Sequence, residues 1–121
     1  MTELVFVVNG KPQPKQRARS TKSGHYYTPK ETVAFERKVA LIAKEIMAKA
    51  GLKKTDKPVT IDVWAYFSDH RRRDADNVLK CVQDGCNDIV YYDDNQITDC
   101  SSHKRYDKLD PRTAVTVTWE D

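Results

Sequence analysis

Apolar residues recur along the chain with two different periods, and the period of two predicts strands. Residues 4–8 form an unbroken apolar run rich in β-branched side chains, short enough for a buried strand. Residues 59–67 alternate strictly, so that every second side chain faces one side of a strand. The alternation returns at residues 113–119, and a weaker strand is predicted around residues 97–106. An Asp110-Pro111 turn separates these last two strands.

The helical period appears in two other segments. A helix of roughly 20 residues is predicted from an apolar face with steps of three and four residues, at Phe35, Val39, Ile42 and Ile46. Thr28 is expected to cap this helix, with Pro29 at its first position and Glu31 completing a capping box, and Gly51 is expected to end it.

A second, acidic helix is predicted to begin at Asp76 and Asn77, which are good capping residues. Its apolar face consists of Val78, Leu79, Val82, Cys86 and Ile89. The order strand, basic loop, helix, strand, acidic helix, strand, strand predicts a small α+β, or mixed α/β, fold. We expect one domain over residues 1–121, with a mixed sheet packed against one long helix and the shorter acidic helix.

The composition limits where the protein works. No run of about 18 apolar residues is present, so no membrane span is expected. Glu3 stands where a signal peptide carries positive charge, which favours a cytoplasmic protein. The three cysteines lack paired CxxC spacing, which favours free thiols over a zinc site.

The net charge of +3 conceals a strong asymmetry. Residues 1–30 hold six basic side chains against one acid, whereas residues 69–99 hold eight aspartates. In the basic loop, Lys15, Arg17 and Arg19 alternate along one side of an extended chain, as phosphate contacts would. The alternative is a solvated loop without a ligand. Tyr26 and Tyr27 follow, and two interpretations stay open for them: stacking on a base or covering the core.

Two tight carboxylate pairs mark the acidic region, Asp74 with Asp76 and Asp93 with Asp94. If residues 77–88 are helical, they carry the chain about 18 Å away at 1.5 Å per residue. Residues 89–94, if extended, cover nearly the same distance at about 3.3 Å each. The spacing therefore allows Asp94 to return beside the first pair.

Paired carboxylates of this kind suit Mg²⁺, which prefers hard oxygen ligands and keeps sites for water and phosphate. A metal held there would act on a phosphodiester, with Lys80 one turn into the helix stabilising transition-state charge. Arg71, Arg72 and Arg73 precede the first pair and are expected to face phosphate. An exposed helix cap alone would also explain the first pair. A calcium loop is excluded, because its next ligand and its glycine would be Val78 and Leu79.

Four motifs occur in a specific order: GKPQPKQRAR at residues 10–19, YTP at 27–29, RRRDADNVLKCVQD at 71–84 and YYDDNQI at 91–97. With these motifs the chain resembles the RusA family of Holliday junction resolvases over nearly its whole length. The family consists of endonucleases of bacteria and their phages. The resemblance therefore implies a Mg²⁺-dependent endonuclease that acts in DNA recombination and repair, in which Mn²⁺ can replace Mg²⁺. It implies a homodimer that makes paired nicks in four-way junctions, and no organic cofactor. Its essential aspartates fall on Asp74, Asp76 and Asp94, its catalytic lysine on Lys80, and Asp93 joins the acidic cluster.

Residues 84–88 depart from the family pattern. Asp84 matches, but its distance along the helix favours a supporting role. Gly85 and Cys86 replace the more usual alanine and leucine, and Asp88 stands where glycine is common. Because glycine weakens a helix by up to about 1 kcal/mol, Gly85 is expected to lower local helix stability. Two other functions stay open: a non-catalytic module that binds branched DNA, and a nuclease for flaps or other branched DNA.

Overall fold

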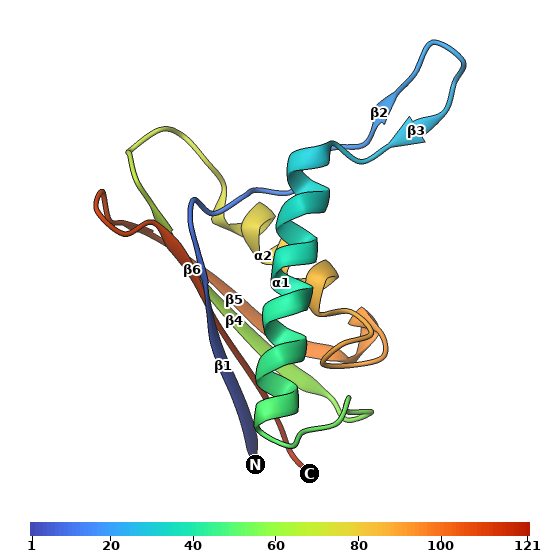
Figure 1. The fold of residues 1–121 in the computed structure, drawn as a ribbon, viewed down its shortest axis with the longest axis vertical. Helices are drawn as coiled ribbons and strands as arrows, with labels where there is room; N and C mark the ends of the chain where they lie inside the picture. The colour runs from blue at the N-terminus through green and yellow to red at the C-terminus, as the bar shows by residue number, and fades with distance from the viewer.

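The computed structural model describes residues 1–121 and shows a four-stranded sheet with two helices on one face (Figure 1). This architecture confirms the predicted small α+β fold. The elements in chain order are β1 (Thr2–Asn9), β2 (Arg19–Ser20), β3 (Tyr26–Tyr27), α1 (Lys30–Lys49), β4 (Val59–Phe67), α2 (Ala75–Cys86), the 3-10 helix η1 (Asp94–Gln96), β5 (Ile97–Tyr106) and β6 (Arg112–Trp119).

The sheet has the strand order β1-β6-β4-β5 and is mixed. Strand β6 runs antiparallel to β1 and to β4, whereas β4 and β5 are parallel, with Val63 opposite Ser102. The parallel pair arises because α2 forms the crossover between β4 and β5, as parallel strands require. The carboxyl ends of β4 and β5 therefore lie at the same edge of the sheet.

Burial alternates along three of the four strands. In β4 and β6 every second residue is buried, which confirms the predicted period of two. In β1, Leu4, Phe6 and Val8 are buried, but Val5 and Val7 are exposed. The expectation of a buried strand therefore holds for only one face of β1, because the helices cover only one side of the sheet.

Helix α1 begins differently from the prediction. Pro29 occupies the capping position with extended backbone angles, and no side chain caps the helix. The expected capping box of Thr28 and Glu31 is therefore absent. At the other end, Gly51 has a φ of 66°, a left-handed conformation that glycine adopts readily, so its predicted role as a helix stop is confirmed.

Gly85 lies where α2 packs against α1. A Cβ atom at this position would stand 2.8 Å from Cβ and Cγ1 of Val39 and 2.9 Å from the carbonyl oxygen of Glu36. The absence of a side chain therefore lets the two helices approach closely. Gly85 is a packing requirement of this fold, which revises the expectation that it only weakens the helix.

The other departure, Asp88, lies two residues beyond the end of α2. Its φ is 63°, a conformation that glycine adopts without strain and aspartate adopts less readily. This explains why glycine suits the position. In this chain Asp88 makes an ion pair with Lys54 at 2.6 Å.

The short strands β2 and β3 form a hairpin that projects away from the body of the domain, beyond the start of α1 (Figure 1). Its turn is closed by the amide of Thr21, which donates to the carbonyl oxygen of His25 at 2.7 Å. Gly24 supplies the positive φ of 85° that the turn needs. Neither helix of the chain has the length and apolar character of a membrane span.

Candidate active site

The first carboxylate pair lies at the start of α2. Asp74 is the capping residue of the helix, and its Oδ1 accepts a hydrogen bond of 2.9 Å from the amide of Asp76. Both side chains are exposed. The predicted start at Asp76 is thus two residues late, and the positive end of the helix dipole lies directly beside this pair.

Strand β5 holds the first pair from the side. The hydroxyl of Ser102 donates to Oδ1 of Asp76, and Nζ of Lys104 donates to the carbonyl oxygen of Arg73 at 3.1 Å. Ser102 and Lys104 are two residues apart on one strand, so they face the same side of the sheet. Sequence reasoning missed both residues. Their only signal was polar side chains at a spacing of two in the weakly patterned strand.

The second carboxylate pair lies at η1. Asp93 caps this short helix in a capping box with Gln96, whose Nε2 donates to the carbonyl oxygens of Thr55 and Lys57 at 2.9 Å each. A hydrogen bond between the two carboxyl groups lowers the pKa of Asp93 and raises the pKa of Asp94. Asp94 is therefore the carboxyl group of this pair that loses its proton at the higher pH.

The first pair lies at the start of α2, whereas the second pair follows the end of α2 by seven residues along the chain. The extended return that the spacing allows is not present, because Asp88 adopts its left-handed conformation and its amide donates to the carbonyl oxygen of Tyr91 at 2.8 Å. Strand β5 begins at Ile97, directly after the second pair, and reaches the first pair at Ser102. The five residue steps between these positions span about 16 Å of strand. No group of three or more His, Cys, Asp or Glu side chains is close enough to hold one metal ion. The assignment of Asp74, Asp76, Asp93 and Asp94 to one metal site stays a prediction.

The three arginines before the first pair have different surroundings. Arg71 and Arg72 are exposed, and Arg71 makes only a long ion pair of 3.8 Å with Asp69. Arg73 instead packs over the ring of Phe67, with Cζ 4.5 Å from the ring centroid, and its guanidinium donates to Asp69. Arg71 and Arg72 remain available to phosphate. Arg73 is bonded within the chain in this structure, and its expected phosphate contact stays a prediction.

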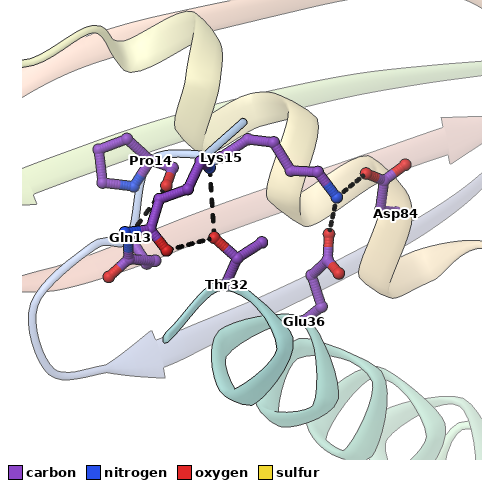
Figure 2. A network of polar contacts seen from close by, with 7 residues as sticks. Gln13, Pro14, Lys15, Thr32, Glu36 and Asp84 are labelled. Atoms are coloured by element: carbon purple, nitrogen blue, oxygen red, sulfur yellow. Dashed lines mark hydrogen bonds and ion pairs between the residues drawn. The ribbon is translucent and has the colours of Figure 1, made fainter. Parts of the chain in front are cut away.

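Lys15 is also drawn into the fold, as Figure 2 shows. Its Nζ lies 2.7 Å from Glu36 of α1 and 2.9 Å from Asp84 of α2, and its amide donates to the carbonyl oxygen of Asn77 at 2.8 Å. Burial opposes its charge, but the hydrogen bonds with both carboxylates outweigh that effect and raise the pKa of Lys15. In this structure Lys15 is therefore an internal counter-ion that joins the two helices, and its role as a phosphate contact stays a prediction. Asp84 supports this network, in line with its expected supporting role.

Lys15 and Arg17 offer a matched test that separates an internal ion pair from a phosphate contact. Lys15→Met is expected to lower the free energy of unfolding by about 1–2 kcal/mol, because it leaves Glu36 and Asp84 without their partner. Arg17→Met is expected to leave stability unchanged and to reduce the salt slope of DNA binding by about one, because Arg17 is exposed. Urea unfolding and affinity measured across salt concentrations check both. The reverse pattern, with the slope change in Lys15→Met, would show that Lys15 contacts phosphate.

The remaining candidates for a nucleophile or a base are engaged in packing, either in the core or against aromatic rings. Burial raises the pKa of both Cys81 and Cys86 to about 12, so neither thiol ionises at neutral pH. His70 stacks on Tyr106 with ring centroids 3.9 Å apart, and His103 stacks on Trp64 at 5.0 Å. Lys80 is exposed four residues into the helix from Asp76, on the same face.

The projecting hairpin and the loop just before it carry exposed cations and exposed aromatic rings together. Arg17 and Arg19 are exposed, and so are Tyr26 and Tyr27. The two tyrosines therefore do not cover the core, which removes one of their two interpretations. Residues 4–30 contain no acidic side chain, so the basic loop and the hairpin that follows it are positively charged.

The chain also matches known proteins over most of its length. Residues 9–118 match the family described as Endodeoxyribonuclease RusA. The chain is 28% identical, over 138 aligned positions covering 94% of each chain, to a protein of Bacillus subtilis (strain 168) titled Uncharacterized protein YqaN. The family match spans the basic loop, the capped acidic helix α2 and the η1 segment. This chain belongs to the RusA family of endodeoxyribonucleases.

Proposed function

We propose that the protein is a divalent-metal-dependent endonuclease that cuts four-way DNA junctions, with Mg²⁺ as the metal and Mn²⁺ as a substitute. The observation that carries the proposal is the exposed pair Asp74 and Asp76, held between the start of α2 and Ser102 of β5. Ligands of parallel strands bind beyond the carboxyl ends of those strands, and the loop from β4 to α2 lies there. The family supplies the DNA substrate, and this geometry supplies a place for the chemistry.

The donor set fits a hard cation. Asp74 and Asp76 each keep a carboxylate oxygen outside the hydrogen bonds described, and Mg²⁺ sites often use one or two carboxylates with waters and substrate phosphates. Asp93 and Asp94 are proposed as further ligands once the η1 segment has moved toward the first pair, because no three such side chains are close enough in this structure to hold one ion. When bound, such a metal lowers the pKa of a water and offsets charge on the phosphoryl oxygens.

The chain's own residues then orient the DNA strand. The positive end of α2 favours a phosphate beside Asp74, where Arg71 and Arg72 are free to contact its neighbours. Lys80, about 6 Å farther along the helix, is placed to stabilise charge on the leaving oxygen. We further propose that two copies act together in DNA recombination and repair, each nicking one of two strands of like polarity.

A cleavage assay tests this function directly. Wild-type protein is mixed with a synthetic four-way junction, a flap and a linear duplex, each with and without Mg²⁺. We expect symmetric paired nicks in the junction only when Mg²⁺ or Mn²⁺ is present. A junction that is bound but uncut in both metals would identify a non-catalytic DNA-binding module. Faster cutting of the flap would identify a flap nuclease.

A further inference from the structure

A hollow of about 310 Å³ lies between the β2–β3 hairpin and the first turn of α1. Its walls come from the hairpin on one side and the helix start on the other, namely Arg19, Tyr27, Thr28, Pro29, Lys30 and Glu31. We refer to these six residues as the hairpin notch. The notch is separate from the carboxylate pairs, and none of its residues takes part in the proposed cleavage chemistry.

The register of the hairpin decides which tyrosine lines the notch. Arg19 pairs with Tyr27 and Ser20 pairs with Tyr26, so Arg19 and Tyr27 share one face and Tyr26 lies on the other. Tyr27 is 48% exposed, whereas Tyr26 is 79% exposed. The difference agrees with a Tyr27 ring partly sheltered by the notch and a Tyr26 ring that projects into solvent.

The lining of the notch suits a single nucleotide. Two cations, Arg19 and Lys30, outnumber the one carboxylate of Glu31 and favour a phosphate. The ring of Tyr27 offers an aromatic surface on which a base can stack. A volume of about 310 Å³ is at the lower end of small-ligand sites, which span roughly 300–1,000 Å³, and is far too small for a duplex.

We propose that the notch receives one unstacked nucleotide at the branch point of the DNA junction, with its base on Tyr27 and its phosphate on Arg19 and Lys30. This inference rests on the proposed function, since it names how that substrate is recognised. Within a linear duplex every base is paired and stacked, so the ring of Tyr27 has no base to meet. At a branch point the stacking is interrupted, and moving a base out requires less free energy. The notch therefore discriminates branched from linear DNA.

Three matched variants test the notch: Tyr27→Ala, Tyr27→Phe and Tyr26→Ala. Affinity is measured without divalent metal for a four-way junction and for a linear duplex of the same sequence. Tyr27→Ala is expected to bind the junction about 10-fold more weakly and the duplex with unchanged affinity. Tyr27→Phe keeps the stacking ring and is expected to retain wild-type affinity. Tyr26→Ala removes a more exposed ring from the other face and is expected to stay within about twofold of wild type.

A fluorescent base reports the contact itself. With 2-aminopurine at the branch point, wild-type protein is expected to change the emission on binding, and Tyr27→Ala is expected to lose that change. A 2-aminopurine placed inside a duplex arm of the DNA junction, away from the branch point, serves as the control and should not respond. Thermal unfolding of each variant separates lost contact from lost folding, because the hairpin lies outside the core.

The outcomes separate this inference from the proposed function. Equal weakening of junction and duplex binding by Tyr27→Ala would overturn the notch, and so would a loss that appears in Tyr26→Ala instead. If wild-type protein cuts junctions and Tyr27→Ala binds them normally, the notch is wrong and the nuclease proposal stands. If wild-type protein changes the branch-point emission through Tyr27 but never cuts, the notch stands and the nuclease proposal is wrong.

Discussion

Replacing Asp76 by asparagine is expected to abolish junction cleavage while junction affinity stays unchanged. Asparagine keeps the size of the side chain and an oxygen that accepts the hydrogen bond of Ser102, so the start of α2 is preserved. It removes the negative charge that a divalent cation needs. If this carboxylate contributes about 4 kcal/mol to metal-assisted stabilisation of the transition state, the rate falls about 1,000-fold.

Single-turnover cleavage with excess protein measures the rate, and a mobility-shift assay without metal measures affinity. Asp99→Asn is the matched control, because Asp99 is an exposed aspartate of β5 that lies outside the proposed site. The control is expected to cut at the wild-type rate. Cleavage by Asp76→Asn within tenfold of wild type would show that Asp76 is no metal ligand.

The arrangement around Asp76 explains why the sequence predicted only part of the site. Asp74, Asp76 and Lys80 are close in sequence, so helical spacing alone places them within the cap and the first two turns of α2. Ser102 is 26 residues from Asp76, and its contact depends on how the parallel pair β4 and β5 sets its register. No local pattern encodes that register. The same limit applies to Lys15. Its positive charge in a basic loop suggested a phosphate contact, but its partners in the fold lie on two different helices.

The fold was predicted better than the site because hydrophobic periodicity is a local signal. The alternation of β4 and the existence of α1 were both readable within single segments. The face of α1 was predicted only in part, because Ala43 and Met47 are buried whereas the predicted Ile42 and Ile46 are only partly buried. Errors arose where several nearby residues could play one role. Asp74, Asp76 and Asn77 are all good helix caps. In the structure the side chain of Asp74 takes this role and accepts a hydrogen bond from the backbone amide of Asp76. At α1, Thr28 had the right chemistry, but the extended backbone of Pro29 takes the capping position.

Gly85 shows how one residue can have opposite meanings at these two levels. From helix propensity, Gly85→Ala is expected to stabilise α2 by up to about 1 kcal/mol. From packing, the new methyl group would meet the side chain of Val39 at 2.8 Å and the backbone oxygen of Glu36 at 2.9 Å. Val39 is fully buried and β-branched, so neither contact can be relieved by a simple rotation. Packing therefore outweighs propensity, and the helices must separate.

Gly85→Ala is accordingly expected to lower the free energy of unfolding by about 2–3 kcal/mol, in the upper range for overpacked cores. Urea unfolding measures the change, and a double-mutant cycle with Val39→Ala identifies its cause. Val39→Ala alone removes buried methyl groups and is expected to destabilise the fold. In the double variant the contact with Cγ1 of Val39 is removed, whereas Cβ of residue 39 and the carbonyl oxygen of Glu36 stay, so the loss should be smaller than the sum of the two but should not vanish. Additive losses would place the strain on those two remaining contacts, and a more stable Gly85→Ala protein would show that helix propensity governs this position.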